Sequence, residues 1–219
     1  YFLSFLRPTL NYQLEDIKAI PIIHWEKIKK ITYDNVKQIL TISKQDWNSF
    51  EYSLAFKTSP LVNIPNATSR IRDAYDLVIQ KWQKIILKTK LLEEENNDTI
   101  ISTYGLQSEL KPEVQLNEVT LICNPVYRYG NKKTKEEYEI LFLTDTMKEL
   151  ISYGIGCMMG RYSLDQQGLI YAQSRNIYFD SSKYNIFPAD DDGIIPIMDM
   201  DWFEDDATRR FVEFIKIAW

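Results

Sequence analysis

Cysteine and histidine are scarce in this chain, and the shortage excludes most metal chemistry. The 219 residues include two cysteines, Cys123 and Cys157, and a single histidine, His24. These are too few for a metal cluster built from thiolates and imidazoles. We expect both cysteines to be reduced cytosolic thiols, although their spacing alone leaves a disulfide open. His24 has no serine, cysteine or aspartate motif around it, so a packing role is favoured over that of a general base.

Long hydrophobic runs and an excess of positive charge are missing as well. No apolar run reaches the roughly 18 residues of a membrane span, and the sequence shows no signal peptide. A cytoplasmic location without a membrane span is therefore predicted. The formal net charge of -5 at pH 7 argues against this chain as the main DNA clamp, because affinity for nucleic acid depends mostly on cations that meet phosphates. A local basic patch remains compatible with this balance.

The composition is that of a folded protein. Hydrophobic residues make up 45% of the chain and aromatic residues 13%, which is enough for a core with several aromatic clusters. The length suits one large domain or two small ones. Helical spacing of apolar residues prevails along the chain. We therefore predict a mainly α fold with a few short β-strands, containing one long helix and a glycine-rich packed helix.

A long helix is predicted from about Ser69 to Asn97, continuing to a C-terminal cap at Gly105. Its apolar residues alternate spacings of four and three, as in a coiled-coil stripe, and they are Ile71, Tyr75, Val78, Trp82 and Ile85. Lysines cover its flanks at Lys81, Lys84, Lys88 and Lys90. They form either a DNA-facing surface or a solvated helix surface, and the solvated surface is favoured.

The stretch from Thr144 to Ala172 combines a helical apolar pattern with glycine. Thr144 is the predicted N-cap of this helix. Gly154, Gly156 and Gly160 each disfavour an isolated helix by about 1 kcal/mol relative to alanine, so we expect the helix to press closely against another backbone. A phosphate-binding loop is not favoured, because these glycines lie inside a helical pattern and do not follow a strand.

Weaker patterns predict two further helices in the first quarter of the chain. One is expected within His24–Leu40, with Thr32 or Asp34 as its cap. Ser43 and Asp46 then resemble a capping box, with aspartate in place of the usual glutamate. The box predicts the start of a short, separate helix that packs through aromatic side chains.

The second half of the chain carries two strand-like runs, at Val119–Cys123 and Gly168–Ala172, and one more helix. That final helix is predicted at about Asp205–Trp219, where preceding carboxylates favour its positive end. Between Pro188 and Ala207 there are eight acidic residues and no lysine or arginine. Asp190, Asp191 and Asp192 in this run lack the pattern of a calcium loop, so a solvated turn is favoured over a metal site.

The segment Asn124-Pro125-Val126-Tyr127 resembles the Asn-Pro-Pro-Tyr signature of N6-adenine methyltransferases. In that signature the asparagine accepts bonds from the target amino group and the aromatic ring stacks on the flipped base. Here valine replaces the second proline, and no segment for S-adenosylmethionine precedes the motif at a useful distance. A catalytic role for Asn124 is therefore not favoured.

The densest basic loop of the sequence follows immediately. It contains Arg128, Lys132, Lys133 and Lys135, interleaved with tyrosines. These four residues are the candidate DNA-binding residues, because cations beside aromatic rings suit contact with phosphates. A solvated loop is the leading alternative. The residues around them include no catalytic, cofactor-binding or metal-ligating set.

Five stretches of the chain resemble, in order and spacing, the PglX family of BREX phage-defence systems. These are residues 11–22 (NYQLEDIKAIPI), 46–56 (DWNSFEYSLAF), 91–114, 144–172 and 187–219. The family comprises adenine-specific DNA methyltransferases related to the type IIG restriction-modification methylases. The resemblance covers nearly the whole chain, but it places the chain downstream of the catalytic motifs. A first residue of tyrosine instead of methionine fits such an internal piece.

The resemblance implies a division of the chain. Residues 1–23 would be the tail of the catalytic domain, 24–110 a helical connector, and 111–219 a helical or mixed region leading into a target-recognition domain. Residues 1–23 are expected to pack poorly here. The complete enzyme would flip an adenine from double-stranded DNA and methylate its amine with S-adenosylmethionine. The chain itself is expected to bind no cofactor and to be inactive alone.

Other functions stay open on the sequence alone. A helical module could dock other BREX components without direct contact to DNA, and an exposed apolar patch around Tyr153 or Trp202 would favour it. An independent enzyme is disfavoured, because the sequence offers no nucleophile–base pair and no metal constellation.

Overall fold

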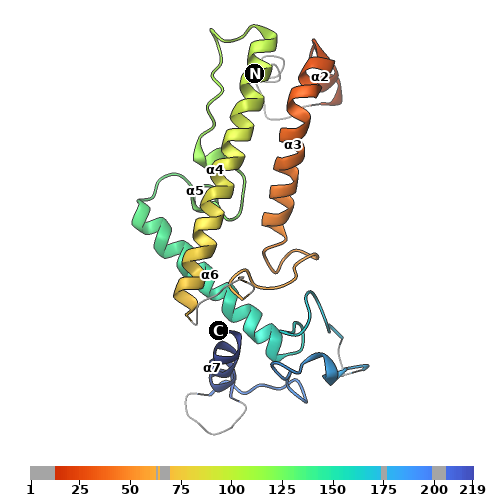
Figure 1. Ribbon diagram of the computed structural model, residues 1–219, viewed down its shortest axis with the longest axis vertical. Helices are drawn as coiled ribbons and strands as arrows, with labels where there is room; N and C mark the ends of the chain where they lie inside the picture. The colour runs from red at the N-terminus through yellow and green to blue at the C-terminus, as the bar shows by residue number, and fades with distance from the viewer. Residues whose placement is uncertain (1–12, 63, 65–69, 174–176, 199–205) are drawn as a thin grey trace. The chain divides into compact units, whose positions relative to one another are not determined.

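A computed structural model describes residues 13–62, 64, 70–173, 177–198 and 206–219 (Figure 1). Its helices are α2 (Leu14–Lys18), α3 (Trp25–Trp47), α4 (Ile71–Tyr104), α5 (Pro125–Tyr129), α6 (Lys135–Met158) and α7 (Ala207–Ala218). Short 3-10 turns lie at η1 (Leu116–Glu118) and η2 (Ser181–Lys183). The mainly α prediction is confirmed. None of the described helices has the length and apolar character needed to cross a membrane.

The described ranges contain no β-strand, so the strands predicted at Val119–Cys123 and Gly168–Ala172 were wrong. The first run folds into tight turns, in which the Leu121 amide donates to the Val119 carbonyl at 2.9 Å. In the second run Gly168 has φ +90°, outside the strand region, and its amide donates to the Lys57 carbonyl at 2.8 Å. Apolar composition alone misled here, since a strand also needs a partner for its backbone groups.

The chain divides into two compact units. Unit 1 comprises Tyr1–Ile39 and Lys90–Val114, and unit 2 comprises Leu40–Thr89 and Gln115–Trp219. Unit 1 is tied by long-range polar contacts. The Asn35 amide donates to Glu95 at 3.0 Å, and the Tyr104 hydroxyl donates to the Pro21 carbonyl at 2.6 Å.

The expectation that residues 1–23 pack poorly falls partly on residues 1–12, which lie outside the described ranges. Within residues 13–23 the short helix α2 buries no side chain, and its Leu14 and Ile17 are 60% and 53% exposed. This weak packing agrees with the expectation. The far end of α4 also agrees with prediction, because the helix stops at Tyr104 and Gly105 follows with φ +69°.

Aromatic side chains fill the core of unit 2. Trp82 of α4 stacks on Phe50 with ring centroids 6.3 Å apart and meets Phe142 of α6 edge-on at 5.5 Å. Tyr153 of α6 packs against Phe214 of α7 at 6.2 Å. Phe214 is fully buried, which anchors α7 to α6. The final helix was predicted closely, since Asp206 caps α7 by accepting from the Thr208 amide at 2.9 Å.

The glycine-rich helix begins earlier than Thr144. Its N-cap is Thr134, which forms a reciprocal capping box with Glu137, so α6 already exists when Thr144 is reached. The predicted close approach at the glycines is present, but the neighbours are rings and not a backbone. A Cβ on Gly154 would lie 2.8 Å from Phe211, and a Cβ on Gly156 would lie 2.6 Å from Tyr162.

The predicted capping box at Ser43 and Asp46 was also wrong, because α3 runs through both residues without a break. Asp46 is 7% exposed and serves a distant segment. Its two carboxylate oxygens accept from the backbone amides of Ile122 at 2.6 Å and Cys123 at 3.0 Å. These bonds hold the 116–124 segment on the end of α3 and take the amides that a strand would have used.

Removal of the Asp46 carboxylate is expected to destabilise the chain. Asp46→Ala leaves the amides of Ile122 and Cys123 without acceptors, at a cost of at least about 2 kcal/mol in the free energy of unfolding. Asp76→Ala, at an exposed ion pair with Arg72, is the matched control and should change stability by less than about 0.5 kcal/mol. Urea denaturation followed by circular dichroism measures both. Equal stability of the two variants would contradict the assigned role.

Gly156 provides a second test. Gly156→Ala gains helix propensity of about 1 kcal/mol but drives a methyl group into the buried Tyr162 ring, which costs more. We expect a net loss of about 1–2 kcal/mol in thermal or urea unfolding. Ser152→Ala, on the exposed side of the same helix, should change stability by less than about 0.5 kcal/mol. An unchanged midpoint for Gly156→Ala would show that Tyr162 yields freely.

Candidate nucleic-acid interface

Asn124 is a structural helix cap and not an exposed catalytic group. Its side-chain oxygen accepts from the Val126 amide at 3.2 Å, which starts α5. Its amide nitrogen donates to the carbonyls of Leu116 at 2.7 Å and Val119 at 2.9 Å. Asn124 is 1% exposed, so no base could reach it without opening these bonds. The resemblance to the methyltransferase signature at this position is therefore one of sequence letters, because Asn124 here caps a helix.

Arg128 lies in a clamp between α5 and α6. Its guanidinium donates to Asp145 at 3.1 Å and to Glu149 at 3.0 Å, and its side chain is 23% exposed. The Tyr129 hydroxyl also donates to Asp145, at 2.7 Å. With two carboxylates already bound, the Arg128 charge is used within the protein.

Aromatic rings enclose the same guanidinium. Its central carbon lies 5.7 Å from the ring centroid of Phe50 and 5.9 Å from that of Phe142. Burial alone would lower the pKa of Arg128, but the hydrogen bond and charge of Glu149 raise it overall. Burial raises the pKa of Glu149, and the bond from Arg128 offsets part of that shift. The clamp is thus a partly desolvated ion pair that fixes α5 on α6.

The three lysines of the predicted site lie apart from this clamp, at the turn before α6. Lys132 and Lys133 are exposed. Lys135 opens the helix and forms an exposed ion pair with Glu139 at 3.7 Å. Sequence proximity therefore groups four cations that the structure separates into one half-buried clamp and one exposed turn. Only the turn presents its charge to a partner.

The acidic run does not assemble a metal site within the described residues. One oxygen of Asp190 accepts from the amides of Asp192, Gly193 and Ile194 at 3.2, 2.7 and 3.2 Å. Its other oxygen pairs with Arg210 of α7 at 3.6 Å. The segment is a turn, as predicted, but Asp190 itself is an internal anchor and not a solvated residue.

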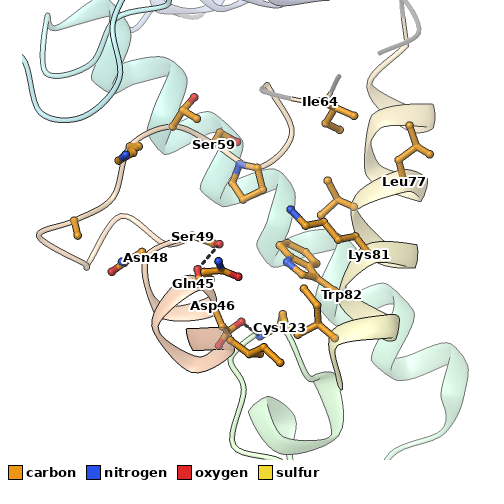
Figure 2. A pocket seen from close by; sticks show the side chains of 17 residues that line it. Gln45, Asp46, Asn48, Ser49, Ser59, Ile64, Leu77, Lys81, Trp82 and Cys123 are labelled. Atoms are coloured by element: carbon orange, nitrogen blue, oxygen red, sulfur yellow. Dashed lines mark hydrogen bonds between the residues drawn. The ribbon is translucent and has the colours of Figure 1, made fainter. Parts of the chain in front are cut away.

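A cleft of about 460 Å³ in unit 2 was not anticipated from the sequence (Figure 2). It is bounded by the end of α3, the 55–60 segment and the first half of α4. Figure 2 shows Lys81 and Trp82 extending from α4 toward the side of the cleft on which Gln45 and Ser59 lie. Lys57 lines the cleft as well. The sequence indicates the charge of this cleft but not its shape, because residues 77–92 of α4 contain lysines and no acidic residue.

Comparison with known proteins identifies two relatives, while no family model matches. The chain is 36% identical over 223 residues to the adenine-specific methyltransferase BrxX of Escherichia coli O9:H4 (strain HS). It is 34% identical over 227 residues to the adenine-specific methyltransferase PglX of Lacticaseibacillus casei (strain Zhang). Both alignments cover 100% of this chain, but only 18% and 17% of the relatives. The resemblance predicted from the sequence is confirmed: over its entire length this chain is similar to one segment of the adenine-specific methyltransferases BrxX and PglX.

Proposed function

We propose that this chain is the helical connector of a DNA adenine-N6 methyltransferase that belongs to a BREX-type phage-defence system. The catalytic domain, which uses S-adenosylmethionine, lies outside the chain, and residues 1–23 form its tail. Residues 24–110 are the connector, and residues 111–219 lead into the target-recognition domain. The substrate of the whole enzyme is double-stranded DNA. The chain positions these domains and has no catalytic or cofactor-binding residue of its own.

The observation that carries this proposal is α4, a single helix of 34 residues. Such a helix rises about 50 Å, and its length is set by backbone hydrogen bonds. A connector of defined length helps to hold a reactive group and a bound base in one geometry. The names of the two relatives supply the reaction, and the local use of Asn124 as a cap supports placing the chemistry elsewhere.

A second function, the docking of other defence components without DNA contact, is favoured by a different observation. Ile140, Ile151 and Ile155 of α6 are 65%, 45% and 46% exposed. Tyr153, around which such a patch was anticipated, is instead buried, and Trp202 lies outside the described residues. Ile151 and Ile155 lie one helical turn apart, and adjacent exposed apolar side chains of this kind suit a protein partner. The connector remains the first proposal because it accounts for α4.

A chimera tests the connector directly. Replacing the matched segment of the Escherichia coli BrxX by this chain should preserve methylation of duplex DNA. Replacing it by a glycine–serine linker of equal length should reduce methyl transfer at least about 100-fold, because the domains lose their fixed geometry. Transfer of a labelled methyl group measures the rate, and calorimetric binding of S-adenosylmethionine shows that the catalytic domain still folds. A linker chimera that methylates at the parental rate would contradict the connector proposal and favour the docking of other defence components. The isolated chain should give no heat with the cofactor.

We also propose that Lys132 and Lys133, at the turn before α6, contact DNA, and removal of their charges tests this contact. Lys132→Gln combined with Lys133→Gln should weaken duplex binding. The slope of log affinity against log salt concentration should become shallower by about 1.8, since each phosphate contact contributes about 0.9 to it. The melting temperature should not change. Arg128→Gln, in contrast, should lower stability by about 2 kcal/mol or more, because it leaves the Glu149 carboxylate without its partner and removes one of the partners of Asp145. Fluorescence anisotropy and thermal unfolding measure the two effects. An unaltered salt slope would remove the turn from the interface.

A further inference from the structure

The cleft between α3 and α4 has the size and chemistry of a binding site. Its volume of about 460 Å³ falls within the roughly 300–1,000 Å³ of ligand pockets. Lys57 and Lys81 line it from two different segments. Trp82 provides an aromatic wall, and serine, threonine, asparagine and glutamine side chains supply polar groups (Figure 2). Cations, polar side chains and one ring together suit an anionic ligand.

The positive charge of the cleft continues along α4. Lys84 and Lys88 follow Lys81 at spacings of three and four, so the three side chains share one helix face, and all three are exposed. Within the described ranges none of these lysines, nor Lys57, takes part in an ion pair. The nearest acidic residues along α4 are Asp76 and Glu93. Along α4 itself, this face therefore carries lysine charges with no acidic residue between them.

The row is long enough to meet more than one phosphate group. From Lys81 to Lys88 the helix rises about 10 Å. Phosphates of one DNA strand follow one another at regular intervals, so a row of this length can meet more than one of them. A single small anion would meet only the two lysines of the cleft. A polyanion with regular charges can engage the whole row.

Asp46 is the one carboxylate that lines the cleft, and its single negative charge, 7% exposed, is outnumbered there by Lys57 and Lys81. Both oxygens of Asp46 accept from the backbone amides of Ile122 and Cys123, at 2.6 and 3.0 Å. Other polar groups are turned to donate. The Asn48 side-chain oxygen accepts from Ser53 at 2.7 Å, which leaves the amide nitrogen for an outside acceptor. The Ser59 oxygen accepts from the Leu61 amide at 3.4 Å, and its proton is the remaining donor.

We infer that Lys57, Lys81, Lys84 and Lys88 form a second contact with the phosphate backbone of double-stranded DNA. Lys57 and Lys81 hold one phosphate at the cleft, and Lys84 and Lys88 meet its neighbours. This surface is separate from the turn at Lys132 and Lys133. The choice of double-stranded DNA as the ligand rests on the proposed function, and the contact itself goes beyond the connector role. Lysines at such contacts carry no sequence preference, so they fix position and not recognition.

Matched pairs of substitutions test the inference on the 219-residue chain. One variant carries Lys84→Gln and Lys88→Gln, a second carries Lys57→Gln and Lys81→Gln, and the control carries Lys29→Gln and Lys30→Gln, two exposed lysines of α3. Anisotropy of a labelled duplex is recorded at several salt concentrations. Each test pair should weaken binding and make the slope of log affinity against log salt shallower by about 1.8, while the control retains the parental slope. Circular dichroism shows that all three remain folded.

Two results would overturn the inference. One is a slope that is the same for a test pair and for the control pair. The other is equal competition by poly-glutamate at the same charge concentration, which would show a general polyanion site and not a phosphate contact. Methylation by the BrxX chimera tests the connector, and DNA binding by the isolated chain tests this surface, so either proposal can fail without the other.

Discussion

The carboxylate of Asp46 organises the part of unit 2 that carries both candidate surfaces. By accepting from the amides of Ile122 and Cys123 it holds a turn-rich segment against the end of α3. The next residue is Asn124, whose side chain closes that segment onto itself and begins α5. One turn later Arg128 fastens α5 to α6. A single buried acceptor thus fixes the segment that leads into α5, because buried amides must find acceptors.

The elements that the sequence predicted well are those whose signals are local. The long helix ends where Gly105 adopts a positive φ, and α7 begins at a capping aspartate. Both signals act within one helical turn. Asp46 shows the opposite case. Its spacing from Ser43 imitates a capping box, but its partners are 76 and 77 residues away, and nothing in the neighbouring sequence identifies them.

The glycines and Arg128 lie between these cases. Glycine inside a helical pattern correctly predicted a close neighbour, since lack of a side chain has no other benefit there. It did not reveal whether that neighbour was a backbone or a ring, and Tyr162 lies against Gly156. Arg128 was grouped with the lysines because they are adjacent in sequence. Its partners Asp145 and Glu149 lie on another helix. Only the structure could therefore show that Arg128 forms an internal clamp and not part of an exposed interface.

Net charge was the least informative property for locating the proposed contacts with DNA. The chain carries -5 overall, yet residues 77–92 contain four lysines and no acid. At physiological salt, charges more than about 8 Å apart are largely screened from one another at a protein surface. A phosphate that approaches the exposed face of α4 therefore meets mainly the nearby lysines, while the acidic run of residues 188–207 affects it only where it comes within that distance. A protein with a negative net charge can still contain a basic surface that binds an anion, because salt screens electrostatic interactions over a distance shorter than the protein itself.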